Sequence, residues 1–216
     1  MKRQIKSFIL DLDGIITDTA EYHYKAWKKM AKEEGISFNR EDNEQLRGVS
    51  RRKSLEIILG DKKVSEEKIQ EMMDRKNGYY QDYLTKLDKN DLLPGAFELI
   101  QKIKNLNLKI AVASSSRNAK TVIKNLDIGD LFDTISDGNS VENSKPAPDL
   151  FLHTAEVLDL KPEKCVVIED AKSGVEAALE ANMIAVGVGP EKRVGEAHYR
   201  YDKVSDIDIN EILDNQ

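Results

Sequence analysis

Short apolar runs recur along the chain and alternate with stretches in which the apolar residues have helical spacing. Continuous apolar runs of this length are typical of strands buried on both faces, as in a parallel sheet. We expect strands at 6–12, 109–113, 134–136, 165–168 and 184–188. Helices are expected between and after them, at 96–105, 118–126, 149–158, 173–181 and 207–213. The alternation predicts an α/β fold, a doubly wound parallel sheet with helices on both of its faces.

The residues between the first and second expected strands carry helical spacing and charge but no strand-like run. Their expected helices are 22–34, 42–46, 50–59 and 65–83, with glycines in the gaps. We therefore expect two domains. Residues 1–17 and 88–216 would form a core that carries the sheet, and residues 18–87 would form a small helical cap domain inserted into it.

The 216 residues include 33 basic and 39 acidic side chains, which gives a net charge of -6, and the basic ones are scattered. This pattern argues against a general footprint for the phosphate backbone of nucleic acid. The apolar segment after Lys6 ends at Asp11, too soon for a signal peptide, and no stretch is long enough to span a bilayer. The single cysteine, Cys165, is expected to be a buried thiol. We expect a cytoplasmic monomer that binds a small molecule, with no nucleic acid and no membrane partner.

Two carboxylates, Asp11 and Asp13, stand one residue apart where the first expected strand meets Gly14. Side chains two positions apart on a strand share a face, so both could address one small object beyond the strand end. Such a pair repels and needs a cation to stay ionised, and Mg²⁺ is the cation that suits oxygen ligands. We interpret this segment as a metal-assisted nucleophilic site.

Three more polar elements stand at expected strand ends or just before a helix: Ser114, Lys145 and the pair Glu169-Asp170. Ligands of open parallel sheets lie outside the carboxyl ends of the strands, where these elements would converge. If Asp11 attacks a phosphoryl group, Mg²⁺ and Lys145 would neutralise the charge. Ser114 would donate a hydrogen bond to a phosphoryl oxygen.

One Mg²⁺ would be held by side-chain oxygens of Asp11 and Asp170, by the main-chain carbonyl of Asp13, and by Glu169 directly or through water. Four carboxylates against one dication and one ammonium leave about one negative charge, so one carboxyl is expected to be protonated part of the time. Asp13 is the natural candidate. It would give a proton to a leaving oxygen and take one from an attacking hydroxyl.

The order of these elements resembles the haloacid dehalogenase superfamily of phosphotransferases. Its four motifs are similar, in order, to Asp11-Leu12-Asp13-Gly14, Ser114, Lys145-Pro146 and Glu169-Asp170. The resemblance covers the whole chain and implies a Rossmann-like core with a helical cap inserted after the first motif. In this superfamily the core motifs specify phosphoryl transfer, whereas the cap largely selects the acceptor.

The cap segments 17–23, 26–27, 47–55 and 75–77 are similar to those of the β-phosphoglucomutase family. This similarity implies that Asp11 carries a phosphoryl group to the 6-hydroxyl of a sugar phosphate, β-glucose 1-phosphate. The resulting β-glucose 1,6-bisphosphate, which would also serve as the priming donor, would return its 1-phosphate to Asp11 and leave glucose 6-phosphate. Asp13 would act as acid and base in both halves.

Several residues are assigned roles by this similarity alone. Arg51 would hold the phosphate that is not transferred, but Arg52 follows where acidic residues are usual, so the phosphate-binding arginine could be shifted by one. Thr19, His23 and Lys76 would couple cap closure to the placing of Asp13. The residues expected to bind the substrate are Thr19, His23, Trp27, Gly48, Val49, Ser50, Arg51, Ser54, Lys76, Ser116 and Asn118.

Three other functions fit parts of the pattern. A phosphatase on the same scaffold would use the same core residues, with water as the final acceptor for phosphate from a small sugar phosphate or phosphoglycolate. A signalling receiver domain also binds Mg²⁺ and accepts phosphate on an aspartate, but its acceptor follows a later strand and it needs no helical insertion. A catalytically silent binding protein is disfavoured because no core-motif residue is missing.

Overall fold

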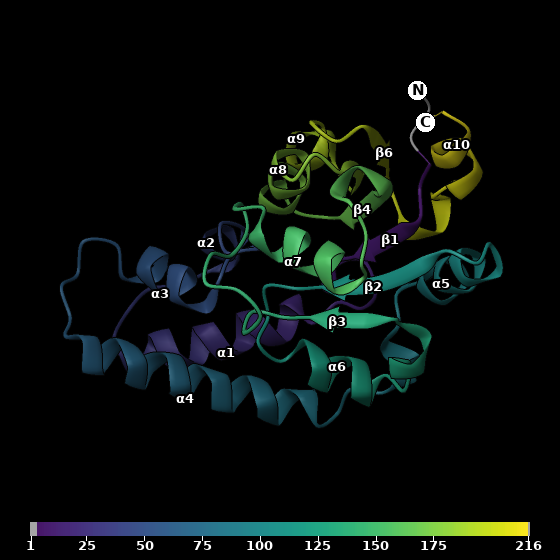
Figure 1. Cartoon of the computed structure of the whole chain (residues 1–216). Coiled ribbons are helices and arrows are strands. Elements are labelled where there is room, and N and C mark those ends of the chain that lie inside the picture. The colour runs from purple at the N-terminus through teal and green to yellow at the C-terminus, as the bar shows by residue number, and fades with distance from the viewer. Residues whose placement is uncertain (1–3, 216) are drawn as a thin grey trace.

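Six parallel strands form one sheet in the computed structural model, which describes residues 4–215 (Figure 1). The strands are β1 (Ser7–Leu10), β2 (Lys109–Ala113), β3 (Thr134–Ser136), β4 (Cys165–Glu169), β5 (Ile184–Val188) and β6 (Tyr199–Tyr201). Their order across the sheet is β3-β2-β1-β4-β5-β6, so the first strand lies in the middle. Leu10 pairs with Val112 on one side and Ile168 on the other. The residue after Leu10 therefore stands at the centre of the carboxyl edge, where ligands of such sheets bind.

Side chains of the strands alternate between two hydrophobic clusters, one on each face of the sheet. Phe8 and Leu10 belong to one cluster, and Ile9 between them belongs to the other. The first cluster is covered by α5 (Ala96–Asn105), α6 (Ala119–Asn125) and α10 (Ile209–Asp214). The second is covered by α7 (Asp149–Val157), α8 (Lys172–Glu180) and α9 (Glu191–Val194). The predicted doubly wound parallel sheet is confirmed.

Short 3₁₀ helices within residues 4–215 are Lys89–Asp91, Gly129–Leu131, Pro162–Lys164 and Val204–Asp206. The thiol of Cys165 is buried in β4, as expected. Across the described part of the chain, no helix combines the length and the apolar character that a membrane crossing requires.

A helical insertion follows β1 and lies beside the sheet (Figure 1). It consists of α1 (Ala20–Glu33), α2 (Arg40–Glu44), α3 (Arg51–Leu59) and α4 (Glu66–Leu84). Their apolar faces share a third cluster, which includes Trp27, Met30, Leu55 and Met72. The insertion therefore has a core of its own, while the domain boundaries at residues 17–18 and 87–88 stay a prediction.

The two connections between the insertion and the sheet are hydrogen-bonded to each other. The Thr17 hydroxyl donates to the carbonyl of Asp91 at 2.7 Å, and the amide of Leu93 donates to the carbonyl of Ile16 at 2.9 Å. The chain thus enters and leaves the insertion at one place, beside the turn that follows β1.

The starts of α2, α3 and α4 differ by one or two residues from the expected ones because side-chain caps decide them, and α1 starts two residues early without such a cap. The side chains of Asn39, Ser50 and Ser65 each accept an amide hydrogen bond from the first turn of α2, α3 and α4. β6 and α9 lie outside the expected elements. β6 is a three-residue edge strand and α9 a four-residue helix, so neither carries a periodic apolar pattern of useful length.

Candidate active site

The turn after β1 brings the first and last motifs together. The amide of Gly14 donates to the carbonyl of Thr17 at 2.8 Å, and Gly14 has φ of +85°, which favours glycine. A Cβ on Gly14 would lie 2.5 Å from the carboxyl carbon of Asp170. Glycine is therefore required here both by the turn and by the close approach of Asp170.

Three buried carboxylates form a group at the carboxyl edge of the sheet. Asp11, Glu169 and Asp170 each offer an oxygen, and these oxygens all lie within 4.8 Å of one another. The ammonium of Lys145, whose side chain is 0% exposed, donates to Asp11 Oδ1 and to Glu169 Oε1, at 2.6 Å in each case. It also donates to the carbonyl of Ala113 at 3.0 Å. Lys145 therefore ties the first and last motifs to the end of β2.

The charges of this group are unbalanced. Burial raises the pKa of Asp11 well above its usual value, although Lys145 opposes the rise. Burial, and then the charge of Glu169, raises the pKa of Asp170 to about 7. Burial alone would lower the pKa of Lys145, but the negative charges of Asp11 and Glu169 outweigh burial and raise this pKa above its usual value. The three oxygen donors beside one ammonium fit a hard dication such as Mg²⁺, which would complete the charge balance.

Asp13 is hydrogen-bonded to the insertion and lines the same cavity as Asp11. Its Oδ1 accepts hydrogen bonds from the amide of Thr19 at 3.0 Å and from the Thr19 hydroxyl. The Thr19 hydroxyl also lies 2.8 Å from the hydroxyl of Tyr80, and His23 Nε2 lies 3.9 Å from Asp13 Oδ2. Burial raises the pKa of Asp13, which the Thr19 hydrogen bonds oppose. The start of α1 thus orients the Asp13 carboxyl.

Behind His23 stands a buried lysine on α4. Lys76 Nζ lies 2.7 Å from His23 Nδ1 and 4.8 Å from the ring centroids of both Trp27 and Tyr80. Burial lowers the pKa of Lys76 far below its usual value, with a smaller contribution from Arg51. Burial and then Lys76 likewise lower the pKa of His23. A neutral His23 that accepts from Lys76 at Nδ1 carries its proton on Nε2, the nitrogen that faces Asp13.

A cavity lies between the sheet edge and the insertion. Most of the expected site residues line it, namely Asp11, Asp13, His23, Trp27, Gly48, Val49, Arg51, Ser54, Lys76, Ser114, Ser116 and Asp170. Five others stand just outside this lining. Thr19 holds Asp13, Lys145 and Glu169 are buried behind Asp11, Ser50 caps α3, and Asn118 bonds to Asn77.

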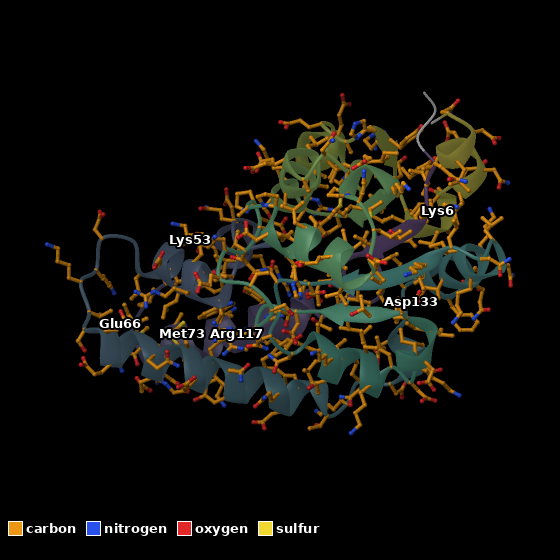
Figure 2. All side chains as sticks on the ribbon, viewed as in Figure 1. Lys6, Lys53, Glu66, Met73, Arg117 and Asp133 are labelled. Carbon is orange, nitrogen blue, oxygen red and sulfur yellow. The ribbon has the colours of Figure 1, made fainter. Side chains whose placement is uncertain are left out.

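The cavity also has lining residues that the sequence reasoning missed, namely Ala20, Asn43, Leu46, Arg47, Ser115 and Arg117. Arg117 lies between two expected site residues and is labelled in Figure 2, where it stands at the face of the core turned towards α4. Because Arg117 lies between Ser116 and Asn118, the sequence could have indicated that it lines the site. For Arg47 the indication was weaker, because only one expected site residue, Gly48, adjoins it.

Arg47 belongs to a loop of the insertion that docks onto the core. Its Nη1 lies 3.1 Å from Asp170 Oδ2. Ser115 Oγ donates to the carbonyl of Gly48 at 3.0 Å, and Ser173 Oγ donates to the carbonyl of Arg47 at 3.4 Å. The insertion is therefore closed over the sheet edge, and Arg47 contacts a candidate metal ligand directly.

Arg51 and Arg52 point in different directions. Arg51 lines the cavity. Arg52 is held on the surface by Glu56 at 2.9 Å and by Glu66. Of the two arginines, Arg51 is thus the one placed to reach a bound molecule.

Comparisons with known proteins agree with this geometry. A family model for haloacid dehalogenase-like hydrolases matches residues 8–188. The chain is 48% identical over 189 residues to the beta-phosphoglucomutase of Bacillus subtilis, covering 86% of this chain and 84% of that protein. It is 30% identical to a phosphorylated carbohydrates phosphatase of Thermotoga maritima, covering 97% of both.

A crystal structure of beta-phosphoglucomutase from Clostridium difficile superposes with a TM-score of 0.94 at 42% identity, covering 98% of this chain and 96% of that one. The likeness therefore extends over both the sheet and the helical insertion. The chain belongs to the haloacid dehalogenase-like hydrolase family.

Proposed function

We propose that this chain acts as a β-phosphoglucomutase, interconverting β-glucose 1-phosphate and glucose 6-phosphate through β-glucose 1,6-bisphosphate. One observation carries the proposal. One cavity is lined both by the Asp11 and Asp13 carboxyl groups and by the side chains of Arg51 and Arg117. A bisphosphate needs such a site, because one phosphate must be transferred while the other is held. The 48% identity to the Bacillus subtilis enzyme supports the same activity.

Asp11 would attack the transferred phosphoryl group and carry it as an aspartyl phosphate. Lys145 supports this role, because its ammonium is 2.6 Å from Asp11 and can offset the negative charge that approaches the carboxylate. Ser114 lines the same cavity and would donate a hydrogen bond from its hydroxyl to a phosphoryl oxygen. Asp11, Glu169, Asp170 and the Asp13 carbonyl would hold Mg²⁺, which would neutralise charge on the phosphoryl oxygens.

Asp13 would move the proton. In the first half-reaction its carboxylate takes the proton of the sugar 6-hydroxyl as the phosphoryl group passes from Asp11 to that oxygen. In the second, its carboxyl gives the proton to the sugar 1-oxygen, which leaves as the 1-phosphate passes to Asp11. The raised pKa of Asp13 suits both the uptake and the release of a proton. It brings the free energies of the ionised and protonated carboxyl closer together at neutral pH. Thr19 and His23 orient this carboxyl from the insertion, so closure of the insertion and placing of the base are linked.

The phosphate that is not transferred would lie near Arg51, Arg117, Ser116 and Asn118. Arg51 and Arg117 both line the cavity, and burial followed by repulsion from Arg117 lowers the pKa of Arg51. A phosphate dianion between them would remove this repulsion. Arg51 offers a planar guanidinium suited to two phosphate oxygens.

Exclusion of water decides between a mutase and a phosphatase. A sugar hydroxyl must compete with water at about 55 M for the aspartyl phosphate, so the cavity must align Asp13 only when sugar is bound. The docked loop at Arg47 and Gly48 closes the cavity on one side. The similarity to the Thermotoga maritima phosphatase keeps hydrolysis of a small sugar phosphate as the second candidate.

The test mixes the purified chain with β-glucose 1-phosphate, Mg²⁺ and a trace of glucose 1,6-bisphosphate, and measures glucose 6-phosphate and free phosphate. Glucose 6-phosphate without matching free phosphate is expected. Stoichiometric phosphate release would establish the phosphatase instead. The Asp11→Asn variant controls for contaminating activity. Parallel assays of Arg51→Ala and Arg52→Ala show which replacement raises the KM, and so which arginine holds the phosphate that is not transferred.

A further inference from the structure

One side-chain amide oxygen, that of Asn77, contacts both Arg51 and Asn118. The proposed function assigns these two residues to the phosphate that is not transferred. Asn77 Oδ1 accepts a hydrogen bond from Arg51 Nη2 at 2.8 Å and another from Asn118 Nδ2 at 2.9 Å. Arg51 begins α3 of the insertion, whereas Asn118 immediately precedes α6 of the core. Asn77 itself lies on α4 and is half-buried. This single oxygen therefore connects the insertion to the core beside the cavity.

A second side chain of α4 supports the same contact. Gln81 lies four residues after Asn77 and so shares its face of the helix. Gln81 Nε2 donates to Asn118 Oδ1 at 3.3 Å. Asn118 is thus held from both of its amide atoms, and the orientation of its amide group follows from these two partners.

Arg51 needs an anchor because its neighbours repel it. Burial and then repulsion by Arg117 lower the pKa of Arg51, and the opposite charge of Asp74 offsets only part of this shift. A guanidinium repelled by Arg117 would turn towards solvent unless a hydrogen bond held it. The Asn77 oxygen supplies that hold without adding a negative charge, which would compete with a phosphate for the same guanidinium.

We propose that Asn77 is a positioning residue that fixes Arg51 and Asn118 relative to each other, so that the closed insertion presents both donors to one phosphate. The inference rests on the proposed function. Asn77 acts through Arg51 and Asn118 and does not itself contact the reacting atoms. Its loss weakens the holding of the distal phosphate in ground state and transition state alike, so it raises KM more than it lowers kcat.

The test measures binding of glucose 1,6-bisphosphate with Mg²⁺ by calorimetry in the Asp11→Asn background, where transfer is blocked. Asn77→Leu keeps the size of the side chain but removes the acceptor, and we expect Kd to rise about tenfold. Asn77→Ala serves if the leucine variant does not fold. Gln70→Leu, on an exposed turn of the same helix, is the matched control and should change Kd less than about twofold.

A second background separates positioning from a structural role. With Arg51 already replaced by Ala, Asn77→Leu should change Kd by less than about threefold, because most of its effect passes through Arg51. The same tenfold loss in both backgrounds, or an unchanged Kd in the first, would overturn the inference while the mutase proposal stands. If the Asp11→Asn reference binds no bisphosphate, the proposed function fails, and the inference fails with it.

Discussion

Removal of the buried ammonium of Lys145 is the sharpest test of the electrostatic arrangement at the sheet edge. Lys145→Met keeps much of the side-chain length but removes the ammonium, which lies 4.8 Å from the Phe151 ring centroid. It deletes the hydrogen bonds to Asp11, Glu169 and the Ala113 carbonyl. The variant then buries three carboxylates beside one another with no internal ammonium among them.

The expected cost follows from these contacts. Each of the two charge-assisted hydrogen bonds is worth about 1.5–3 kcal/mol, and removal of one partner of a buried ion pair typically costs about 3–5 kcal/mol. We therefore expect the free energy of unfolding to fall by about 4 kcal/mol at pH 8 in EDTA. Protonation can relieve part of this cost, because it removes charge from the orphaned carboxylates.

The pH dependence of this cost has a definite sign. Lys145 has a raised pKa in the folded chain, so its stabilisation of the unmodified protein is fully present at both pH 5.5 and pH 8. In the variant Asp11 and Asp170 keep pKa values above their unfolded ones, because burial raises both and the lysine that opposes the rise at Asp11 is gone. Their penalty is therefore small near pH 4 and grows as pH rises, and the loss of stability should be smaller at pH 5.5 than at pH 8.

Urea unfolding in EDTA at the two pH values measures both quantities. Lys172→Met is the matched control, because Lys172 is 63% exposed and only 3.6 Å from Glu176, and it should change stability by less than about 0.5 kcal/mol. A loss below about 1 kcal/mol for Lys145→Met at pH 8, or an equal loss at both pH values, would refute the reasoning.

Three further predictions concern the same edge of the sheet. Asp11→Asn should abolish the mass increase of one phosphoryl group after treatment with acetyl phosphate and Mg²⁺, whereas Asp13→Asn should slow sugar turnover about 100-fold or more yet still bind glucose 1,6-bisphosphate in calorimetry. The pKa of Asp170 is about 7, against about 3.9 unfolded, so the Tm in EDTA should fall between pH 5 and pH 8, and Mg²⁺ should restore it; a flat Tm would contradict this. Gly174→Ala places a Cβ 1.9 Å from Glu169 Oε1, so a Mg²⁺ titration should show at least about tenfold weaker binding, and unchanged affinity would mean that Glu169 is not a ligand.

The central strands could be predicted from the sequence because burial on both faces demands continuous apolar runs. Phe8-Ile9-Leu10 and Val166-Val167-Ile168 are fully buried and form neighbouring strands. Tyr199–Tyr201 carries no such run, since an edge strand pairs on one side only and keeps a partly exposed surface. Its extended conformation comes from pairing with β5, which only the tertiary structure supplies.

The sequence by itself also determined which residues meet at the reaction centre. Asp11, Ser114 and Glu169 each stand at or just after the end of a parallel strand, and parallel strands present their carboxyl ends at one edge. Residue order and strand pattern were enough for this, because the sheet topology brings such positions together whatever the intervening chain contains.

Only the tertiary structure decided which contacts each of these side chains makes. It bonds the Asp13 carboxyl to Thr19 of the insertion, and it places Arg51 in the cavity while Arg52 pairs with surface glutamates. It also joins Arg51 to Asn118 through Asn77, across 41 positions of chain between Asn77 and Asn118. Such choices depend on the direction of individual side chains in packed surroundings, and no periodic pattern along a chain encodes a contact between segments so far apart.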